Sequence, residues 1–170
     1  MLLPFLIGLI TLFLTTKNLF AKARSREEQI TDLEVKGLIE TVNYKVNRAF
    51  GIEEWGDEGS HYFLELEDKS ILYLRDQKLC EYEPIEDDPE LNQPRQFPCT
   101  EFTIRKHKTK GYLIDLFCAG EVLEPEIIIP ITHRAFFIYL LDLEPYLIIR
   151  NRTYDQIKTE HLQRSQEKNI

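Results

Sequence analysis

The chain has 170 residues, which is enough for one domain with its own hydrophobic core and short additional segments. Its composition, 43% hydrophobic and 29% charged, is typical of a globular protein and excludes one that crosses a membrane many times. Residues 27–170 contain 17 basic and 29 acidic side chains, a formal charge of −12, which would repel nucleic acid and anionic lipid. We therefore expect no nucleic-acid partner.

The first segment of the chain is strongly apolar. Residues 2–16 contain no charged side chain, and the apolar character continues, interrupted by one lysine and one asparagine, to Ala21. A helix needs about 20 residues to span a bilayer, so residues 1–21 predict a transmembrane anchor that contacts lipid from Leu2 to Ala21. Two alternatives are a signal peptide cleaved near Ala23 and a helix on the membrane surface. The absence of Lys or Arg before the apolar run argues against a signal peptide.

Charges next to the apolar segment predict its orientation. Every basic residue in the first 26 positions follows the apolar run of residues 2–16, and no acidic residue occurs there. By the positive-inside rule, the C-terminal domain is then cytoplasmic, and residues 22–32 form a basic collar and linker. If the segment were cleaved instead, the domain would be exported. The four cations are Lys17, Lys22, Arg24 and Arg26.

Residues 33–152 are expected to form a β-rich globular domain. Apolar and polar residues alternate from Val42 to Phe50, which predicts a strand, and a shorter strand is predicted at residues 33–35. Two further segments predict β-hairpins: His61 to Leu74, with its turn at residues 68–70, and Phe102 to Cys118, with its turn at residues 108–111. These elements indicate an antiparallel sheet.

The later segments predict shorter elements and helices. Residues 77–82 are expected to add an edge strand, and residues 83–98, with four prolines and five acids, form a long loop. Residues 132–142 predict a helix capped by Thr132, and residues 146–150 a returning strand. Thr153 and Gln156 match a capping box, which begins a C-terminal helix and polar tail over residues 153–170.

The expected fold class is α+β, mostly antiparallel β, with C-terminal helices and one preceding transmembrane helix. The sheet would be a small barrel or sandwich-like. Pleckstrin-homology-like domains, small barrels closed by a C-terminal helix, are compatible with this element order as a fold analogy only.

The glycine-rich loop at residues 51–60 provides the candidate catalytic residues. Two of its four acids, Asp57 and Glu58, together with His61 just after it, have the chemistry of an acid–base pair or a metal site. Their spacing matches no metal-binding motif, and no glycine-rich phosphate-binding motif occurs in the chain. We therefore predict no metal and no cofactor, and treat these residues as the basis of an alternative function.

Two other features are candidates for binding. Trp55, the only tryptophan, lies on the same loop, and the second hairpin carries a basic patch at its tip. Turns are commonly charged because they are exposed, and this simpler explanation competes with a binding role. The patch consists of Arg105, Lys106, Lys108 and Lys110.

The three cysteines form no recognisable framework. Cys80, Cys99 and Cys118 are an odd number and contain no CxxC motif, which indicates reduced thiols, although one bridge between two of them stays open. A glycosylation pattern at residues 151–153 matters only if the domain is not cytoplasmic.

These observations favour a non-enzymatic, single-pass membrane protein whose acidic cytoplasmic domain binds another protein. The alternative is a membrane-tethered hydrolase or metal-dependent enzyme that uses the loop at residues 51–61.

Overall fold

A computed structural model describes residues 24–55, 59–84 and 93–167 of the chain. The chain divides into two compact units, and the boundary between them lies between Leu38 and Ile39. Residues 1–21, which we predict to be a transmembrane anchor, lie outside the described residues. None of the helices in the described ranges is long and apolar enough to cross a membrane.

The described part of the first unit is one helix, α2 (Arg26–Val35). The side chain of Ser25 accepts a hydrogen bond from the backbone N–H of Glu28, whose carboxylate accepts one from the backbone of Ser25. This capping box satisfies two N–H groups that would otherwise lack partners at the start of the helix. The strand predicted at residues 33–35 is therefore wrong, because these residues form the last turn of α2.

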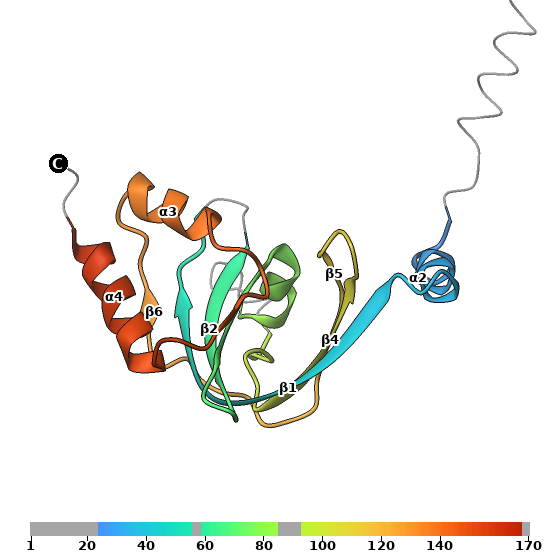
Figure 1. The fold of residues 1–170 in the computed structure, drawn as a ribbon, viewed down its shortest axis with the longest axis horizontal. Helices are drawn as coiled ribbons and strands as arrows, with labels where there is room; N and C mark the ends of the chain where they lie inside the picture. Colours follow the sequence, from blue (N-terminus) through green and yellow to red (C-terminus); the bar gives the residue numbers. More distant parts are fainter. Residues whose placement is uncertain (1–23, 56–58, 85–92, 168–170) are drawn as a thin grey trace, which may run out of the picture. The chain divides into compact units, whose positions relative to one another are not determined.

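The second unit is a seven-stranded sheet with two C-terminal helices, which confirms the α+β fold class (Figure 1). The strand order is β5-β4-β1-β2-β3-β7, and β6 pairs with β1 in parallel while the other strand pairs are antiparallel. The strands are β1 (Ile39–Ile52), β2 (Ser60–Leu66), β3 (Ile71–Asp76), β4 (Glu101–His107), β5 (Leu113–Cys118), β6 (Ile128–Ile129) and β7 (Ile148–Ile149). The helices are α3 (Arg134–Leu141) and α4 (Tyr154–Gln166).

Strand β1 joins the two halves of the sheet. Its first half, residues 39–45, pairs with β4, and its second half, residues 46–52, pairs with β2. The register with β2 shifts between Val46 and Arg48, close to where the partner changes. Such an irregularity lets a strand bend, and Figure 1 shows β1 as a long curved strand. The strand predicted at residues 42–50 is confirmed and extends in both directions.

Both predicted hairpins are confirmed. In the first, Lys69 takes a positive φ of 67°, and the carboxylate of Asp68 accepts a hydrogen bond from the backbone N–H of Ser70. In the second, the imidazole Nδ1 of His107 accepts the backbone N–H groups of Thr109 and Lys110, each at 3.2 Å. Each turn is thus held by a side chain at or near its start, which fixes the register of the strands that follow.

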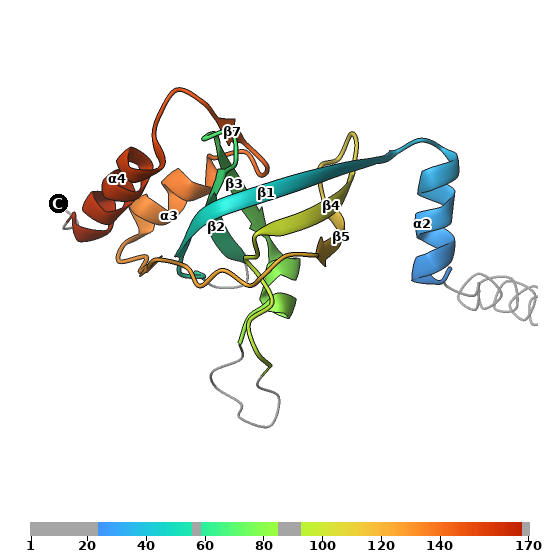
Figure 2. The same cartoon turned by 90° about the horizontal axis from the view of Figure 1, so that it is seen from below.

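The hairpin of β2 and β3 is covered on both faces. One face packs in an apolar layer with β4 and β5, and the other packs against α3 and α4, which lie together beside β2 and β3 in Figure 2. As a result, all seven residues of β2 are buried. The first layer includes Tyr62, Leu64, Leu72, Leu74, Phe97, Phe102, Ile104 and Leu116. The second includes Phe50, Phe63, Ile71, Tyr73, Phe136, Leu140, Tyr154 and Ile157.

The edge strand predicted at residues 77–82 is wrong, because these residues form a 3-10 helix, η1 (Gln77–Tyr82). Asp76 caps it by accepting the backbone N–H of Lys78 at 2.9 Å. Two side chains of η1 then reach β5: Lys78 Nζ donates to the carbonyl of Ile114 at 2.8 Å, and the Tyr82 hydroxyl donates to that of Leu116 at 3.0 Å. Side chains, and not a further strand, therefore occupy carbonyl groups of β5 at this end of the sheet.

The predicted C-terminal elements are confirmed with one correction. Strand β7 is shorter than predicted, and Thr153 and Gln156 form the expected capping box at α4. The N-cap of α3 is His133, not Thr132: its Nδ1 accepts the backbone N–H of Phe136 at 3.1 Å. The Thr132 hydroxyl instead donates to the carbonyl of Ser165, near the end of α4.

Burial on both sides makes a test of the fold possible. Phe63 is fully buried, so we expect Phe63→Ala to lower the free energy of unfolding by about 3–5 kcal/mol through lost contacts and a cavity. Phe117→Ala is the control, because that ring is 52% exposed and its loss should change stability by about 0.5 kcal/mol or less. Denaturant unfolding of the detergent-solubilised chain, followed by Trp55 fluorescence, measures both. Equal effects of the two variants would contradict this account of the core.

Candidate functional site

The loop after β1 presents Trp55 at the surface. Its indole is 41% exposed and stacks on the ring of Phe137 in α3, with the ring centroids 5.8 Å apart and 26° between their planes. Glu54, next to Trp55, forms two hydrogen bonds: one carboxylate oxygen accepts the backbone N–H of Gly59 at 3.3 Å, and the other accepts the thiol of Cys80 at 3.6 Å. The predicted binding residue is thus accessible and held in one position.

The three candidate catalytic residues are not brought together by the described part of the structure. Asp57 and Glu58 lie outside the described residues, and His61 is fully buried between the sheet and the C-terminal helices. Among the described residues, no group of three or more His, Cys, Asp or Glu side chains is placed to hold a metal ion. The catalytic role of this loop therefore stays a prediction.

His61 takes part in a chain of hydrogen bonds that joins the sheet to α3. The hydroxyl of Tyr73 donates to the carbonyl of Leu140 at 3.2 Å, so it accepts the hydrogen bond from Nδ1 of His61 at 2.8 Å. Nε2 of His61 then carries the lone pair, and it has no hydrogen-bond partner among the described residues. Burial, together with the nearby charge of Arg75, lowers the pKa of His61 to about 4, so the ring is neutral at pH 7.

His161 of α4 is buried in the same layer. Its Nδ1 bonds to the carbonyl of Ile157 at 2.8 Å, its ring lies 4.5 Å from that of Phe63, and burial lowers its pKa. Its Nε2 likewise has no hydrogen-bond partner within the described ranges. Both imidazoles thus pack as neutral aromatic rings, which is a structural role that the sequence pattern did not distinguish from a catalytic one.

The basic patch at the tip of the second hairpin is partly neutralised. Arg105 pairs with Asp115 at 3.2 Å, and Lys106 pairs with Glu40 at 3.6 Å and lies over the ring of Tyr146. The other two predicted binding residues, Lys108 and Lys110, are exposed, and neither forms an ion pair with another described residue. The predicted patch of four cations is therefore reduced to two that project from the turn.

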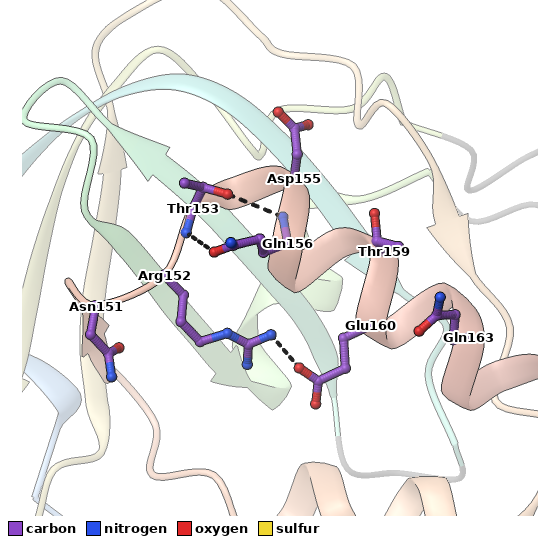
Figure 3. A pocket seen from close by; sticks show the side chains of 8 residues that line it. All are labelled: Asn151, Arg152, Thr153, Asp155, Gln156, Thr159, Glu160 and Gln163. Atoms are coloured by element: carbon purple, nitrogen blue, oxygen red, sulfur yellow. Dashed lines mark hydrogen bonds and ion pairs between the residues drawn. The ribbon is translucent and has the colours of Figure 1, made fainter.

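A polar hollow lies beside the start of α4, where sequence reasoning placed only a helix cap (Figure 3). It has a volume of 720 Å³. Arg152 points across it toward Glu160, with which it forms an ion pair, while Thr153 and Gln156 are occupied by the capping box. The residues around it are Asn151, Arg152, Thr153, Asp155, Gln156, Thr159, Glu160 and Gln163.

The remaining acid of the hollow belongs to a cluster that fixes α4 on the sheet. Arg48 of β1 binds Glu126 at 2.6 Å and Asp155 at 2.9 Å, and its guanidinium lies 4.2 Å from the ring of Tyr154. Lys158 binds the same Glu126 at 2.6 Å. These cations lower the pKa of both carboxyl groups. The charged side chains that line the hollow are thus already paired, which argues for a structural role.

Comparison with protein-family models, curated proteins and solved structures finds no match to this chain.

The two buried histidines predict how stability depends on pH. Unfolded histidine binds a proton near pH 6.5, whereas His61 resists protonation until about pH 4, so acid favours the unfolded state between these values. From pH 7.5 to pH 5, the free energy of unfolding should fall by about 2 kcal/mol through His61 alone, and His161 should add to this. Above pH 6.5 neither contributes.

Denaturant unfolding at several pH values measures this slope. His61→Asn keeps a side-chain donor toward Tyr73 but cannot titrate, so its stability should vary less between pH 7.5 and 5 than that of the wild type. A slope that both His61→Asn and His161→Asn leave unchanged would show that these imidazoles are not responsible.

Proposed function

We propose that this chain is a single-pass membrane-anchored protein whose cytoplasmic domain binds another protein, with Trp55 in the contact surface. The observation that carries the proposal is the exposed indole of Trp55, held against Phe137. Ile138, the next residue in α3, is also 47% exposed, so apolar surface is available beside the stacked pair.

An exposed tryptophan of this kind suits protein recognition. Tryptophan is enriched among the residues that contribute most to binding energy, because its large ring excludes water while its N–H still finds a partner. The indole already stacks on Phe137, so little conformational entropy of this side chain would be lost when a partner binds. Lys108 and Lys110 offer a second, electrostatic contact that favours an acidic partner surface.

The membrane part of the proposal rests on the sequence. The uncharged run of residues 2–16 and its continuation to Ala21 have the length and composition of a spanning helix, and the four cations that follow favour a cytoplasmic domain. This arrangement would place the acidic domain next to, but not on, an anionic membrane surface.

For the sheet, we propose a partly closed barrel. The contacts that support closure join β5 to η1 and to the last residue of β3. Besides the two bonds from η1, the carboxylate of Asp76 accepts the backbone N–H of Leu113 at 3.3 Å. Closure through side chains protects an edge that would otherwise pair with another chain, which directs binding to the Trp55 surface and away from β5.

The orientation predicts which thiol reports on the location of the domain. Cys118 is exposed, Cys80 is half-buried and Cys99 is buried, so a membrane-impermeant thiol reagent should label Cys118 first. We expect labelling only after cells are permeabilised, and loss of that label in Cys118→Ser. Labelling of Cys118 in intact cells would place the domain outside and overturn the proposed orientation.

The contact surface predicts the effect of removing the indole. Trp55→Ala should lower the affinity of the partner by about 30-fold or more, as expected for a residue worth about 2 kcal/mol. The measurement is quantitative mass spectrometry of proteins recovered with the detergent-solubilised full chain.

Phe117→Ala is the matched control, because this ring is 52% exposed on β5 and belongs neither to the Trp55 surface nor to the turn that carries Lys108 and Lys110. Its variant should retain the partner at wild-type level. Recovery of the same proteins at the same level by both variants would reject Trp55 as the contact residue.

A further inference from the structure

Two cysteines that are far apart in the sequence lie at the same end of the β4–β5 pair: Cys99 just before β4 and Cys118 at the end of β5. Beyond the ends of these strands the backbone pairing continues: the N–H groups of Ala119 and Gly120 both donate to the carbonyl of Glu101, at 2.9 and 3.1 Å. Cys99 and Val122 form an isolated antiparallel bridge. The residues next to both cysteines are therefore already held against each other.

The two thiols lie near each other. The thiol of Cys99 donates to the carbonyl of Glu101 at 3.4 Å, and the same carbonyl accepts the backbone N–H of Ala119, the residue after Cys118, at 2.9 Å. Cys99 is fully buried, whereas Cys118 is exposed. The arrangement thus pairs an accessible thiol with a protected one, which is the arrangement of a reactive and a resolving cysteine.

We propose that Cys99 and Cys118 are a site of reversible oxidation, which closes into an intramolecular disulfide when the domain meets a peroxide. Cys80 is excluded from this pair by its position, since its sulfur contacts Ser60 and Glu54 instead. The inference does not depend on the proposed partner or on the side of the membrane that the domain occupies.

The reaction has two steps. The thiolate of Cys118 attacks one oxygen of hydrogen peroxide, forming an S–O bond and breaking the O–O bond, and the departing hydroxide takes a proton to become water. The sulfur of Cys99 then attacks the sulfur of Cys118, forming the S–S bond and releasing the S–O oxygen as a second water, which carries away the thiol proton of Cys99. Two thiols are oxidised and one peroxide is reduced.

The surroundings favour Cys118 as the first to react. It is the exposed member, and its interaction with the nearby Cys99 thiol lowers its pKa, which raises the fraction of reactive thiolate. The interaction with Cys118 and burial raise the pKa of Cys99, so Cys99 stays protonated until the sulfenic acid forms beside it. The order of the two steps follows from this difference.

The test is peptide mapping of the detergent-solubilised full chain after treatment with hydrogen peroxide and blocking of free thiols. Trypsin separates the three cysteines into residues 79–95, 96–105 and 111–134. We expect residues 96–105 and 111–134 to appear as one linked peptide, 2 Da lighter than the sum of the two, which dithiothreitol separates. The Cys80→Ser variant should give the same link.

Cys118→Ser is the decisive variant, because its side chain is exposed and its loss should not prevent folding. It should give no linked peptide and leave Cys99 unmodified. Oxidation that stops at sulfinic acid on Cys118, a link that involves Cys80, or a dimer linked through two copies of Cys118 would each overturn the proposal.

Stability gives a second readout. A bond between residues 99 and 118 restricts the unfolded chain, so the oxidised protein should unfold at a temperature higher by about 5 °C or more than the reduced protein. Cys118→Ser cannot form this bond, so the shift should disappear in that variant. A lower unfolding temperature on forming the linked peptide would show that the bond does not fit this geometry.

Discussion

The burial of both faces of the β2–β3 hairpin is the constraint on which the rest of the domain depends. A sheet normally exposes one face, but here every residue of β2 is buried, so each face needs its own apolar partner layer. The curved β1 makes this possible, because it pairs with β4 in its first half and with β2 in its second. The C-terminal helices cover the remaining face.

Burial on both sides also explains the polar groups in the second layer. His61 is one of the β2 residues whose side chains face α3 and α4. Because its ring is fully buried, the ring N–H needs a hydrogen-bond acceptor from the protein instead of water. The Tyr73 hydroxyl meets this need and passes its own hydrogen to the carbonyl of Leu140, near the end of α3. Burial and the nearby charge of Arg75 keep the imidazole neutral. Because the bond from His61 to Tyr73 is part of the link between the sheet and α3, protonation of His61 makes the helix attachment sensitive to acid.

Sequence patterns predicted the parts of the fold that depend on neighbouring residues. Both hairpins could be predicted because their strands pair with the segment that follows in the sequence. The alternation of β1 could be predicted because it lies in the residues of the strand itself, although half of the strand pairs with the distant β4. Ser25 and Glu28 have the spacing of a capping box, but α2 is only ten residues long and buries no side chain, so its sequence has no apolar face that would distinguish a helix from a strand at residues 33–35. The exposure of Trp55 and the hollow beside α4 were out of reach, since they depend on Phe137 and on the contact of Arg48 with distant carboxylates.

The position of the two cysteines relative to the apolar layers limits what their oxidation can change. Cys99 packs in the layer shared with β4 and β5, whereas Trp55 stacks on Phe137, which packs against the layer beneath the C-terminal helices. The β2–β3 hairpin separates these layers. Because the hairpin is closely packed on both faces, a movement of side chains in one layer reaches the other only if the side chains on both faces of the hairpin can rearrange. A disulfide between segments that are already paired imposes no such shift. Oxidation should therefore stabilise the β4–β5 end of the domain and leave the Trp55 surface able to bind.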